Sequence, residues 1–201
     1  MEKIILTDDM LLGEGIHKKA YRHPFDSKKC IKICYNSDGT REQLKELKYR
    51  NLRKTPVSVF PEYFGTVETS LGTGYVFEFI KNYDDSVCMS LLDYFSDEKL
   101  IKENFEELVR LAVQYRDTLY RESVVTMKMT PNNLLVRHLS ESETKIYIMD
   151  DIGSSALIPL EYYFDYFAKS RVRRKWKQFL ETCNAWRPSQ TMTEFTKRVK
   201  F

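Results

Sequence analysis

The sequence predicts an α+β protein with two lobes, an antiparallel-sheet lobe followed by a reduced, mostly helical lobe. The first lobe is indicated by short alternating strand patterns separated by glycine and proline turns, with one charged helix among them. After a polar break at 81–85, helical periodicity dominates and is interrupted by one β-hairpin. We therefore expect a single domain over 1–201, with an N-lobe of about 1–80 and a C-lobe of about 81–201.

The composition excludes several classes of protein. The chain of 201 residues is 42% hydrophobic and 30% charged, which suits a folded core. No apolar run is long enough to span a membrane and the first ten residues lack a signal-peptide core, so we expect a cytoplasmic protein with no membrane partner. The net charge of +3 does not by itself indicate a nucleic-acid binder, and the four cysteines lack metal-ligand spacing, so buried free thiols are expected.

Three strands are expected at the start of the chain. Residues 11–21 indicate a strand, a glycine loop and a second strand, and residues 29–35 alternate as a third. Gly13 and Gly15 would let the backbone bend closely over a phosphate, although two glycines in a hairpin also occur in ordinary turns. Taken alone, Lys32 would be the solvent-facing residue of an edge strand, because it is the single charge in an apolar stretch.

A charged helix is expected over 40–54, followed by two strands at 59–68 and 74–80. The apolar positions of the helix are Leu44, Leu47 and Leu52. Glu42 and Glu46 lie one turn apart on one face of this helix, and a solvated charged face is the simpler interpretation for Glu42.

A β-hairpin is expected at the centre of the second lobe. Residues 134–136 form one apolar run, residues 145–149 alternate, and a polar turn joins them. Because a hairpin holds its two ends together, Asn133 should lie close to Asp150 and Asp151. An amide oxygen and a carboxylate that converge on one point are ligands that Mg²⁺ prefers.

Helices are expected at 90–95, 96–121, 160–183 and 193–199, and the second of these should be the longest. Its inward stripe would be Phe105, Leu108, Leu111, Ala112, Tyr115 and Leu119. In the third helix, apolar residues recur at every fourth position, which drifts against the 3.6-residue turn and predicts a bend or break near 169–170.

The stretch from Lys169 to Lys177 carries six basic residues and no acidic one. The simpler interpretation is a solvated helix face. The functional interpretation is a patch for an anionic ligand, which would be a phosphorylated molecule, an acidic partner or nucleic acid.

In chain order, the motifs resemble the protein-kinase signature set. They are Gly13-x-Gly15-x-x-x-x-Ala20, Lys32 in a strand, Glu46 in a helix, Pro131 to Val136, and Asp151-Ile152-Gly153. More narrowly, the segments LGEGIHKKAYRHP, LKYRNLRK, TMKMTPNNLLVRHLSESE and DDIGSSALIPL resemble the PhoP regulatory network (YrbL) family of bacterial proteins. This resemblance covers nearly the whole chain and implies a two-lobed protein-kinase-like fold.

The resemblance implies that ATP and Mg²⁺ are cofactors. The residues that it assigns to the nucleotide are Gly13, Gly15, Ala20, Lys32, Glu46, Phe77, Glu78 and Ile80. Lys32 would pair the α- and β-phosphates with Glu46 as its partner, Phe77 would shape the adenine pocket, and the backbone of Glu78 and Ile80 would bind the adenine edge. The Mg²⁺ ligands would be Asn133 and Asp151, whereas Asp150 would be either a further ligand or, more simply, a strand-end residue.

Two departures from the kinase pattern bear on catalysis. Lys128 stands five residues before Asn133, where a kinase has its catalytic aspartate, and a charged lysine cannot accept a proton. Lys128 would either neutralise charge on the transferred phosphoryl group or cross the site and block it. Asp151 is the second catalytic candidate. Only 48 residues follow Gly153, which favours a small acceptor or no acceptor over a folded protein substrate.

Three functions are therefore open. The first is an atypical phosphotransferase that acts on a small or non-protein acceptor, favoured by four retained residues, namely Lys32, Glu46, Asn133 and Asp151. The second is a pseudokinase that binds nucleotide and regulates a protein partner, favoured by Lys128. The third is a nucleic-acid-binding regulator that uses the basic stretch, whose affinity should fall steeply with salt.

Overall fold

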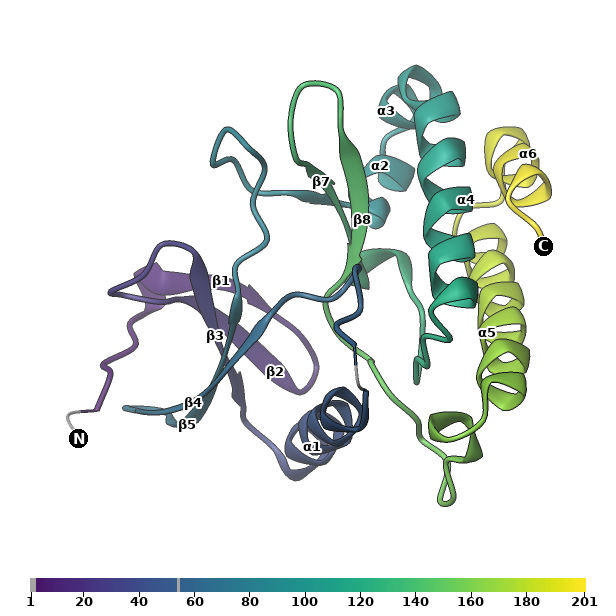
Figure 1. Ribbon diagram of the computed structural model, residues 1–201. Helices are drawn as coiled ribbons and strands as arrows, with labels where there is room; N and C mark the ends of the chain where they lie inside the picture. Colours follow the sequence, from purple (N-terminus) through teal and green to yellow (C-terminus); the bar gives the residue numbers. More distant parts are fainter. Residues whose placement is uncertain (1–2, 54) are drawn as a thin grey trace. The chain divides into compact units, whose positions relative to one another are not determined.

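The computed structural model describes residues 3–53 and 55–201, which form two compact units (Figure 1). Unit 1 comprises Met1–Leu47 and Pro61–Ile80, and unit 2 comprises Lys48–Phe60 and Lys81–Phe201. The expected α+β class is confirmed, because an antiparallel sheet comes first and helices dominate the C-terminal part.

The sheet of unit 1 is antiparallel and has the strand order β1-β2-β3-β5-β4. Its strands are β1 (Leu11–Glu14), β2 (Lys18–Arg22), β3 (Lys29–Cys34), β4 (Tyr63–Thr69) and β5 (Gly72–Glu78). The first three strands match the prediction, whereas β4 begins only after Pro61, which lacks the N–H group that a strand ladder needs. Because β3 lies between β2 and β5, the interpretation of Lys32 as an edge-strand residue is wrong.

The two faces of this sheet differ in chemistry. One face holds a small apolar cluster of Leu6, Tyr21, Ile31, Ile33 and Val76. The other face carries Cys30, Tyr75 and Phe77, with Leu47 of the following helix packed against them. By strand alternation, Lys32 lies on this second face with Cys30.

The helix α1 (Ser37–Leu52) begins three residues before the predicted start, and the predicted end at Lys54 lies outside the described residues. Of its three apolar leucines only Leu47 packs inward, because Leu44 is 55% exposed and Leu52 is also exposed. The inward side also carries Gln43 and Glu46, which are 0% and 1% exposed. The apolar residues of a helix mark its buried side only where the surface beneath them is apolar. Here the second sheet face carries the charged Lys32, and polar residues of the helix are buried instead.

Unit 2 contains a small antiparallel sheet of order β6-β7-β8. Its strands are β6 (Met89–Ser90), β7 (Leu134–His138) and β8 (Thr144–Ile148). The predicted hairpin is confirmed, and its register pairs Leu134 with Ile148. The N–H of Ile148 also donates to the carbonyl of Val59 over 3.0 Å, so the segment that follows α1 lies along β8.

The helices of unit 2 are α2 (Leu91–Ser96), α3 (Glu98–Glu103), α4 (Phe105–Arg121), α5 (Asp165–Trp186) and α6 (Gln190–Arg198). A single helix over 96–121 is wrong, because Asp97 caps α3 and the helical run is interrupted again at Asn104. The predicted helix from 160 begins instead with a 3₁₀ turn at Leu160–Tyr162. No break occurs at 169–170, since α5 continues through both residues.

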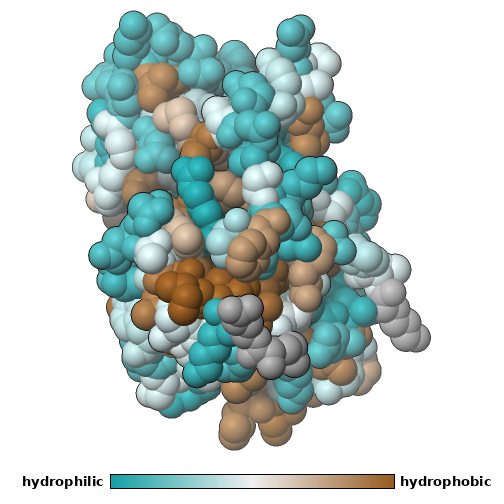
Figure 2. Space-filling view, turned by 90° about the vertical axis from the view of Figure 1, so that its left-hand side faces the viewer, coloured by the Kyte–Doolittle hydropathy of each residue, from teal (hydrophilic) through white to brown (hydrophobic). Residues whose placement is uncertain are grey.

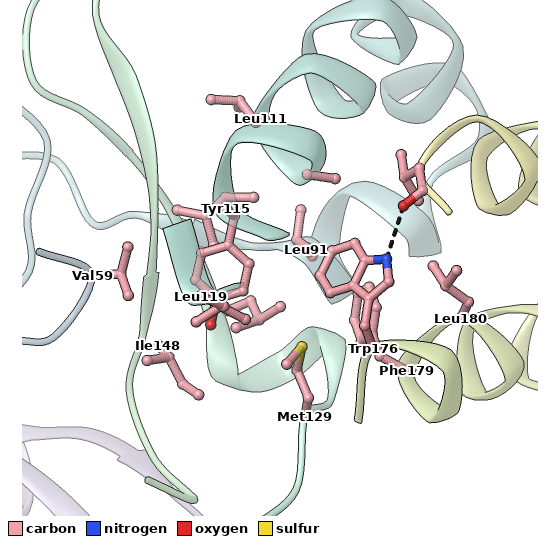
Figure 3. Packing of buried hydrophobic residues seen from close by; sticks show 14 of the residues in the cluster. Val59, Leu91, Leu111, Tyr115, Leu119, Met129, Ile148, Trp176, Phe179 and Leu180 are labelled. Carbon is pink, nitrogen blue, oxygen red and sulfur yellow. Dashed lines mark hydrogen bonds between the residues drawn. The ribbon is translucent and has the colours of Figure 1, made fainter. Parts of the chain in front are cut away.

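The core of unit 2 joins α4, α5 and the hairpin (Figure 3). The predicted stripe of α4 is confirmed from Leu108 to Leu119, whereas Phe105 is only partly buried. Trp176 and Phe179 of α5 pack into the same cluster. The indole Nε1 of Trp176 donates to the Val199 carbonyl over 2.8 Å, which attaches the C-terminal segment to the core.

The surface is mixed in character. Figure 2 shows brown hydrophobic patches on an otherwise largely hydrophilic face, and exposed large hydrophobic residues of unit 1 include Ile5, Ile16 and Leu71. Among the described residues, every helix is too short or too polar to cross a membrane.

Candidate functional site

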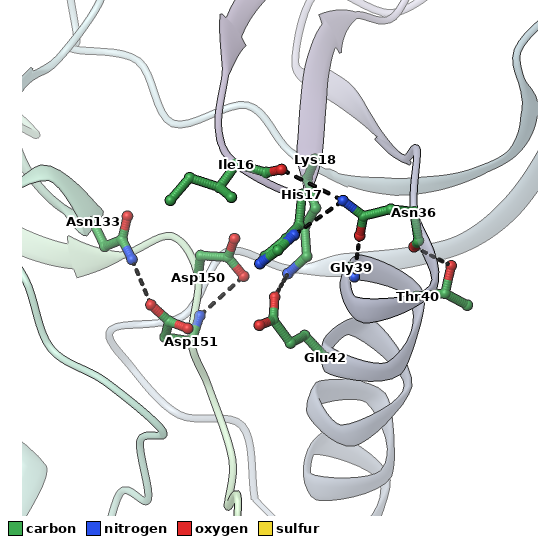
Figure 4. A network of polar contacts seen from close by, with 10 residues as sticks. All are labelled: Ile16, His17, Lys18, Asn36, Gly39, Thr40, Glu42, Asn133, Asp150 and Asp151. Atoms are coloured by element: carbon green, nitrogen blue, oxygen red, sulfur yellow. Dashed lines mark hydrogen bonds and ion pairs between the residues drawn. The ribbon is translucent and has the colours of Figure 1, made fainter.

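The ends of the β7–β8 hairpin bring together the two predicted Mg²⁺ ligands (Figure 4). Asn133 Nδ2 donates to Asp151 Oδ2 over 2.9 Å. The hairpin holds this pair in place, because the N–H of Met149 donates to the Asn133 carbonyl over 2.9 Å. The approach of Asn133 to Asp151 that the hairpin predicted is therefore present in the structure.

The backbone of Asp151 adopts an unusual conformation. Its φ of 61° lies in the left-handed region, which residues other than glycine seldom enter, although Asp and Asn do so more often than most. Two hydrogen bonds hold it there, from its own N–H to Asp150 Oδ1 over 2.9 Å and from the N–H of Met127 to its carbonyl over 2.7 Å. Backbone strain of this kind concentrates at functional sites. Asp150 thus has a local role in the turn, as a strand-end residue would.

The donor set of this pair suits Mg²⁺ bound together with phosphate. Mg²⁺ is commonly held by one or two carboxylates, with phosphate oxygens and water completing its shell. The carboxylate of Asp151 and Oδ1 of Asn133 are such oxygens, and Oδ1 also accepts a bond of 3.0 Å from Asn132. Within 3–53 and 55–201, no group of three or more His, Cys, Asp or Glu side chains forms a metal cage.

Lys128 lies on a segment that is bonded to the Asp151 loop. The Met127–Asp151 bond is followed by an antiparallel bridge between Thr126 and Ile152. Lys128 itself is exposed. The structure therefore places this predicted catalytic lysine two residues beyond the bridge, in the same unit as Asp151.

The six basic residues of α5 are not equivalent. Arg171 is 7% exposed and forms a 2.7 Å ion pair with the partly buried Glu161 carboxylate, while its Nε donates to the Thr126 carbonyl over 3.1 Å. Burial lowers the pKa of Arg171, and the charge of Glu161 opposes that shift. The sequence did not distinguish Arg171 from its neighbours, because the partner Glu161 lies ten residues away on a 3₁₀ turn. Among the others, Arg173, Arg174 and Lys177 are exposed.

The glycine loop of unit 1 leaves space beside its backbone. A Cβ at Gly13 would meet no atom within 4 Å, and a Cβ at Gly15 would meet only the Lys18 carbonyl at 3.6 Å. Neither glycine has a positive φ. The fold itself therefore does not require glycine at these two positions, which leaves close approach of a ligand as a reason for them. Ala20 lies opposite Gly13 in the sheet and is also paired with Lys32.

The tip of the glycine loop is bonded to the start of α1, a feature that the sequence interpretation missed (Figure 4). Asn36 Oδ1 accepts the Gly39 N–H over 2.8 Å, and its Nδ2 contacts Nδ1 of His17 over 3.0 Å. A Cβ at Gly39 would lie 2.5 Å from the His17 carbonyl, so only glycine fits. The available signal was Asn36 directly before the helix, a residue type favoured at N-caps.

Lys32 and Glu46 are both buried in unit 1. Lys32 is 7% exposed, and its Nζ lies 4.8 Å from the ring centroid of Phe77, which is fully buried. Glu42 is not simply solvated, because its carboxylate lies 4.0 Å from the buried ammonium of Lys18. In unit 1, the two strand lysines and Glu46 of α1 are therefore buried, and Glu42 of α1 lies beside them at the edge of the interior. Buried charges of this kind are rare unless they are paired or used.

The two residues predicted to bind the adenine edge differ in what they offer. The N–H of Glu78 already donates to the Glu62 carbonyl over 2.8 Å. The Glu78 carbonyl accepts a weak bond of 3.7 Å from the Cys30 thiol. The side chain of Ile80 is 1% exposed. The N–H of Glu78 is therefore already bonded within the protein.

Together these features define an α+β protein with a strained Asn–Asp pair at the open end of a hairpin and with buried lysines on a separate antiparallel sheet. The sequence model of a known family, described as PhoP regulatory network protein YrbL, matches residues 4–184 of this chain. The chain belongs to this family, as the motifs predicted.

Two relatives show the extent of this similarity. The chain is 37% identical over 182 residues to "Uncharacterized protein YrbL" of Escherichia coli strain K12. The alignment covers 88% of this chain and 86% of the relative. The protein of the same name from Shigella flexneri gives the same values. The similarity thus extends over most of the length of these relatives, and the family match over residues 4–184 contains the glycine loop and the hairpin.

Proposed function

We propose that the chain is an atypical kinase-like phosphotransferase that binds Mg·ATP and acts on a small or non-protein acceptor. The observation that carries this proposal is the Asn133–Asp151 pair, in which an amide and a carboxylate are held together and Asp151 keeps a φ of 61°. A functional role for the Asp151 carboxylate, as a ligand of the Mg²⁺ ion that accompanies ATP, would account for this backbone strain.

Unit 1 supports the proposal through residues suited to a nucleotide. Gly13 and Gly15 offer backbone that a phosphate can approach, since the positions of their missing Cβ atoms are open. Lys32 offers a buried ammonium group beside Phe77. A buried lysine gains more from a phosphate than an exposed one does, because the interior screens its charge less.

The roles of individual residues follow from these positions. Asn133 and Asp151 would hold Mg²⁺, which when bound neutralises charge on the phosphates. Lys32 would bind and orient the phosphates, and Lys128 would place a positive charge near a phosphoryl group in transfer. Positioning and charge neutralisation supply most of the catalysis in phosphoryl transfer, so the absence of an aspartate at position 128 does not preclude a reaction.

The second candidate is a pseudokinase that binds nucleotide and regulates a partner. One observation favours it, namely that the position of the usual catalytic base holds an exposed lysine. A third candidate, a nucleic-acid-binding regulator, has less support because Arg171 in the basic stretch is committed to Glu161.

Calorimetric titration of ATP, with and without Mg²⁺, tests the proposal. We expect Mg²⁺-dependent binding that Lys32→Ala and Asp151→Asn each abolish, whereas Asp150→Asn retains the oxygen that accepts the Asp151 N–H and should bind normally. Unchanged binding in Lys32→Ala and Asp151→Asn would show that the site assignment is wrong. Release of γ-phosphate in the same sample separates the first two candidates, because only the phosphotransferase should show turnover that Asp151→Asn removes.

A further inference from the structure

A pocket of about 450 Å³ lies beside Lys128 in unit 2. Its polar lining comes from Lys128, Lys175, Gln178, Glu181 and Thr182. The pocket falls in the size range of small-molecule sites, which is about 300–1,000 Å³.

The backbone connects this pocket to the Asp151 loop. Lys128 follows Met127, whose N–H donates to the Asp151 carbonyl over 2.7 Å. On the other wall, Lys175 comes one helical turn after Arg171, which is bonded to the Thr126 carbonyl over 3.1 Å. Both lysines therefore project from elements that are bonded to the same short segment, next to Asp151.

The charge balance of the pocket is positive. Among the residues that the structure describes, Lys128 and Lys175 form no ion pair, whereas Glu181 lies 3.9 Å from Lys177, which is outside the pocket. Burial and the charges of Arg171 and Arg174 lower the pKa of Lys175, while the Asp151 carboxylate raises it. Lys175 is thus within electrostatic reach of Asp151 and lies among like charges, an arrangement that an anion would stabilise.

We propose that this pocket binds a small hydroxylated anion, a phosphorylated or carboxylated polyol, and that this anion is the phosphoryl acceptor. The two ammonium groups would bind the acidic group, and Gln178, Thr182 and Glu181 would bind hydroxyl groups. The acceptor role rests on the proposed function. In the reaction, a hydroxyl oxygen of the anion forms a bond to the γ-phosphorus of ATP, the bond from that phosphorus to ADP breaks, and the hydroxyl proton passes to water.

Calorimetric titration without nucleotide tests the pocket. The probes are ribose 5-phosphate and gluconate, which separate a phosphate from a carboxylate, and ribose is the uncharged control. We expect at least one anion to bind and ribose not to bind. Lys128→Gln and Lys175→Gln should each weaken binding about tenfold, because each removes one charged contact. Lys177→Gln, on the same helix but outside the pocket, should change the dissociation constant by less than about twofold.

Several outcomes would overturn the inference. The pocket is excluded if neither anion binds, or if Lys177→Gln weakens binding as much as the two pocket variants do. Transfer of labelled phosphate from ATP to the bound anion tests the acceptor role, and binding without a labelled product overturns that role alone. Failure of the proposed function is distinguishable, because Mg·ATP titration is measured separately and does not require the anion.

Discussion

At the scale of single residues, two glycines in the same unit have opposite reasons to be glycine. Gly39 has no room for a Cβ, whereas Gly13 has open space on that side. The sequence assigned a role to Gly13 from its motif but did not single out Gly39. Only the position of the His17 carbonyl shows that Gly39 is required by packing.

The first prediction concerns this contrast. Gly39→Ala should lower the free energy of unfolding by about 1–3 kcal/mol, because the new Cβ would overlap the His17 carbonyl. Gly13→Ala should change it by less than about 0.5 kcal/mol and should instead weaken Mg·ATP binding. Urea unfolding and calorimetry measure the two quantities. A stability loss in Gly13→Ala as large as that in Gly39→Ala would contradict the assignment.

The second prediction concerns the buried ion pair of Arg171 and Glu161. Glu161→Gln should lower the free energy of unfolding by about 3–5 kcal/mol, since it leaves the Arg171 charge buried without its carboxylate. The double variant Glu161→Leu with Arg171→Met should lose less, because it leaves no buried charge. Chemical unfolding of the two variants gives the comparison. Equal or larger loss in the double variant would mean that the pair itself is strongly stabilising.

At the scale of elements, α1 has an inward side that is polar. The side chain of Gln43 is fully buried, and neither its amide oxygen nor its nitrogen has a hydrogen-bond partner within the described residues. A buried amide without partners is costly, whereas an apolar side chain of similar shape is not. The exposed Leu44 beside it shows that the helix is not oriented by its leucines.

The third prediction follows from this orientation of α1. Gln43→Met should raise the free energy of unfolding by about 1–3 kcal/mol, because it removes two unpaired polar atoms from the interior. Leu44→Ala is the matched control on the exposed side and should change the value little. Thermal and urea unfolding provide the measurement. A loss of stability in Gln43→Met would show that the amide has a partner, such as water or a ligand, in solution.

At the scale of the whole molecule, most of the apolar core belongs to unit 2, whereas unit 1 has two small clusters. Cys30 is buried in unit 1, and Cys88 and Cys183 are buried in unit 2. Burial raises the pKa of the Cys183 thiol to about 12 and that of Cys88 to about 11. None of the four cysteines forms a disulfide among the described residues, and Cys34 is only half-buried.

The fourth prediction is a loss of stability at alkaline pH. The unfolded chain ionises Cys183 near its ordinary pKa of 9.0, whereas the folded protein keeps the thiol protonated up to about 12. The contribution of this thiol is therefore intact below pH 9 and decreases as pH rises from 9 towards 12, with a slope of about 1.4 kcal/mol per unit. Urea unfolding at several pH values should show a shallower slope in Cys183→Ala. Identical slopes would contradict the burial effect.

The predictable part of the fold consists of features set by neighbouring residues. The period-two strands, the stripe of α4, the hairpin and the approach of Asn133 to Asp151 all follow from local alternation, helical spacing and turn chemistry. The family likewise follows from contiguous motifs. Helix boundaries were less accurate, as at Asp97 and Asn104, because capping side chains compete with continuous helical periodicity.

The sequence by itself thus determined the α+β class, the family and the candidate cation pair, because local backbone preferences are sufficient for these. Tertiary structure alone decided that β3 is central, that α1 turns Gln43 and Glu46 inward, that Arg171 is buried on Glu161, and that a pocket lies beside Lys128. The physical reason is that burial and charge pairing depend on which distant surfaces pack together. No window of neighbouring residues contains that information.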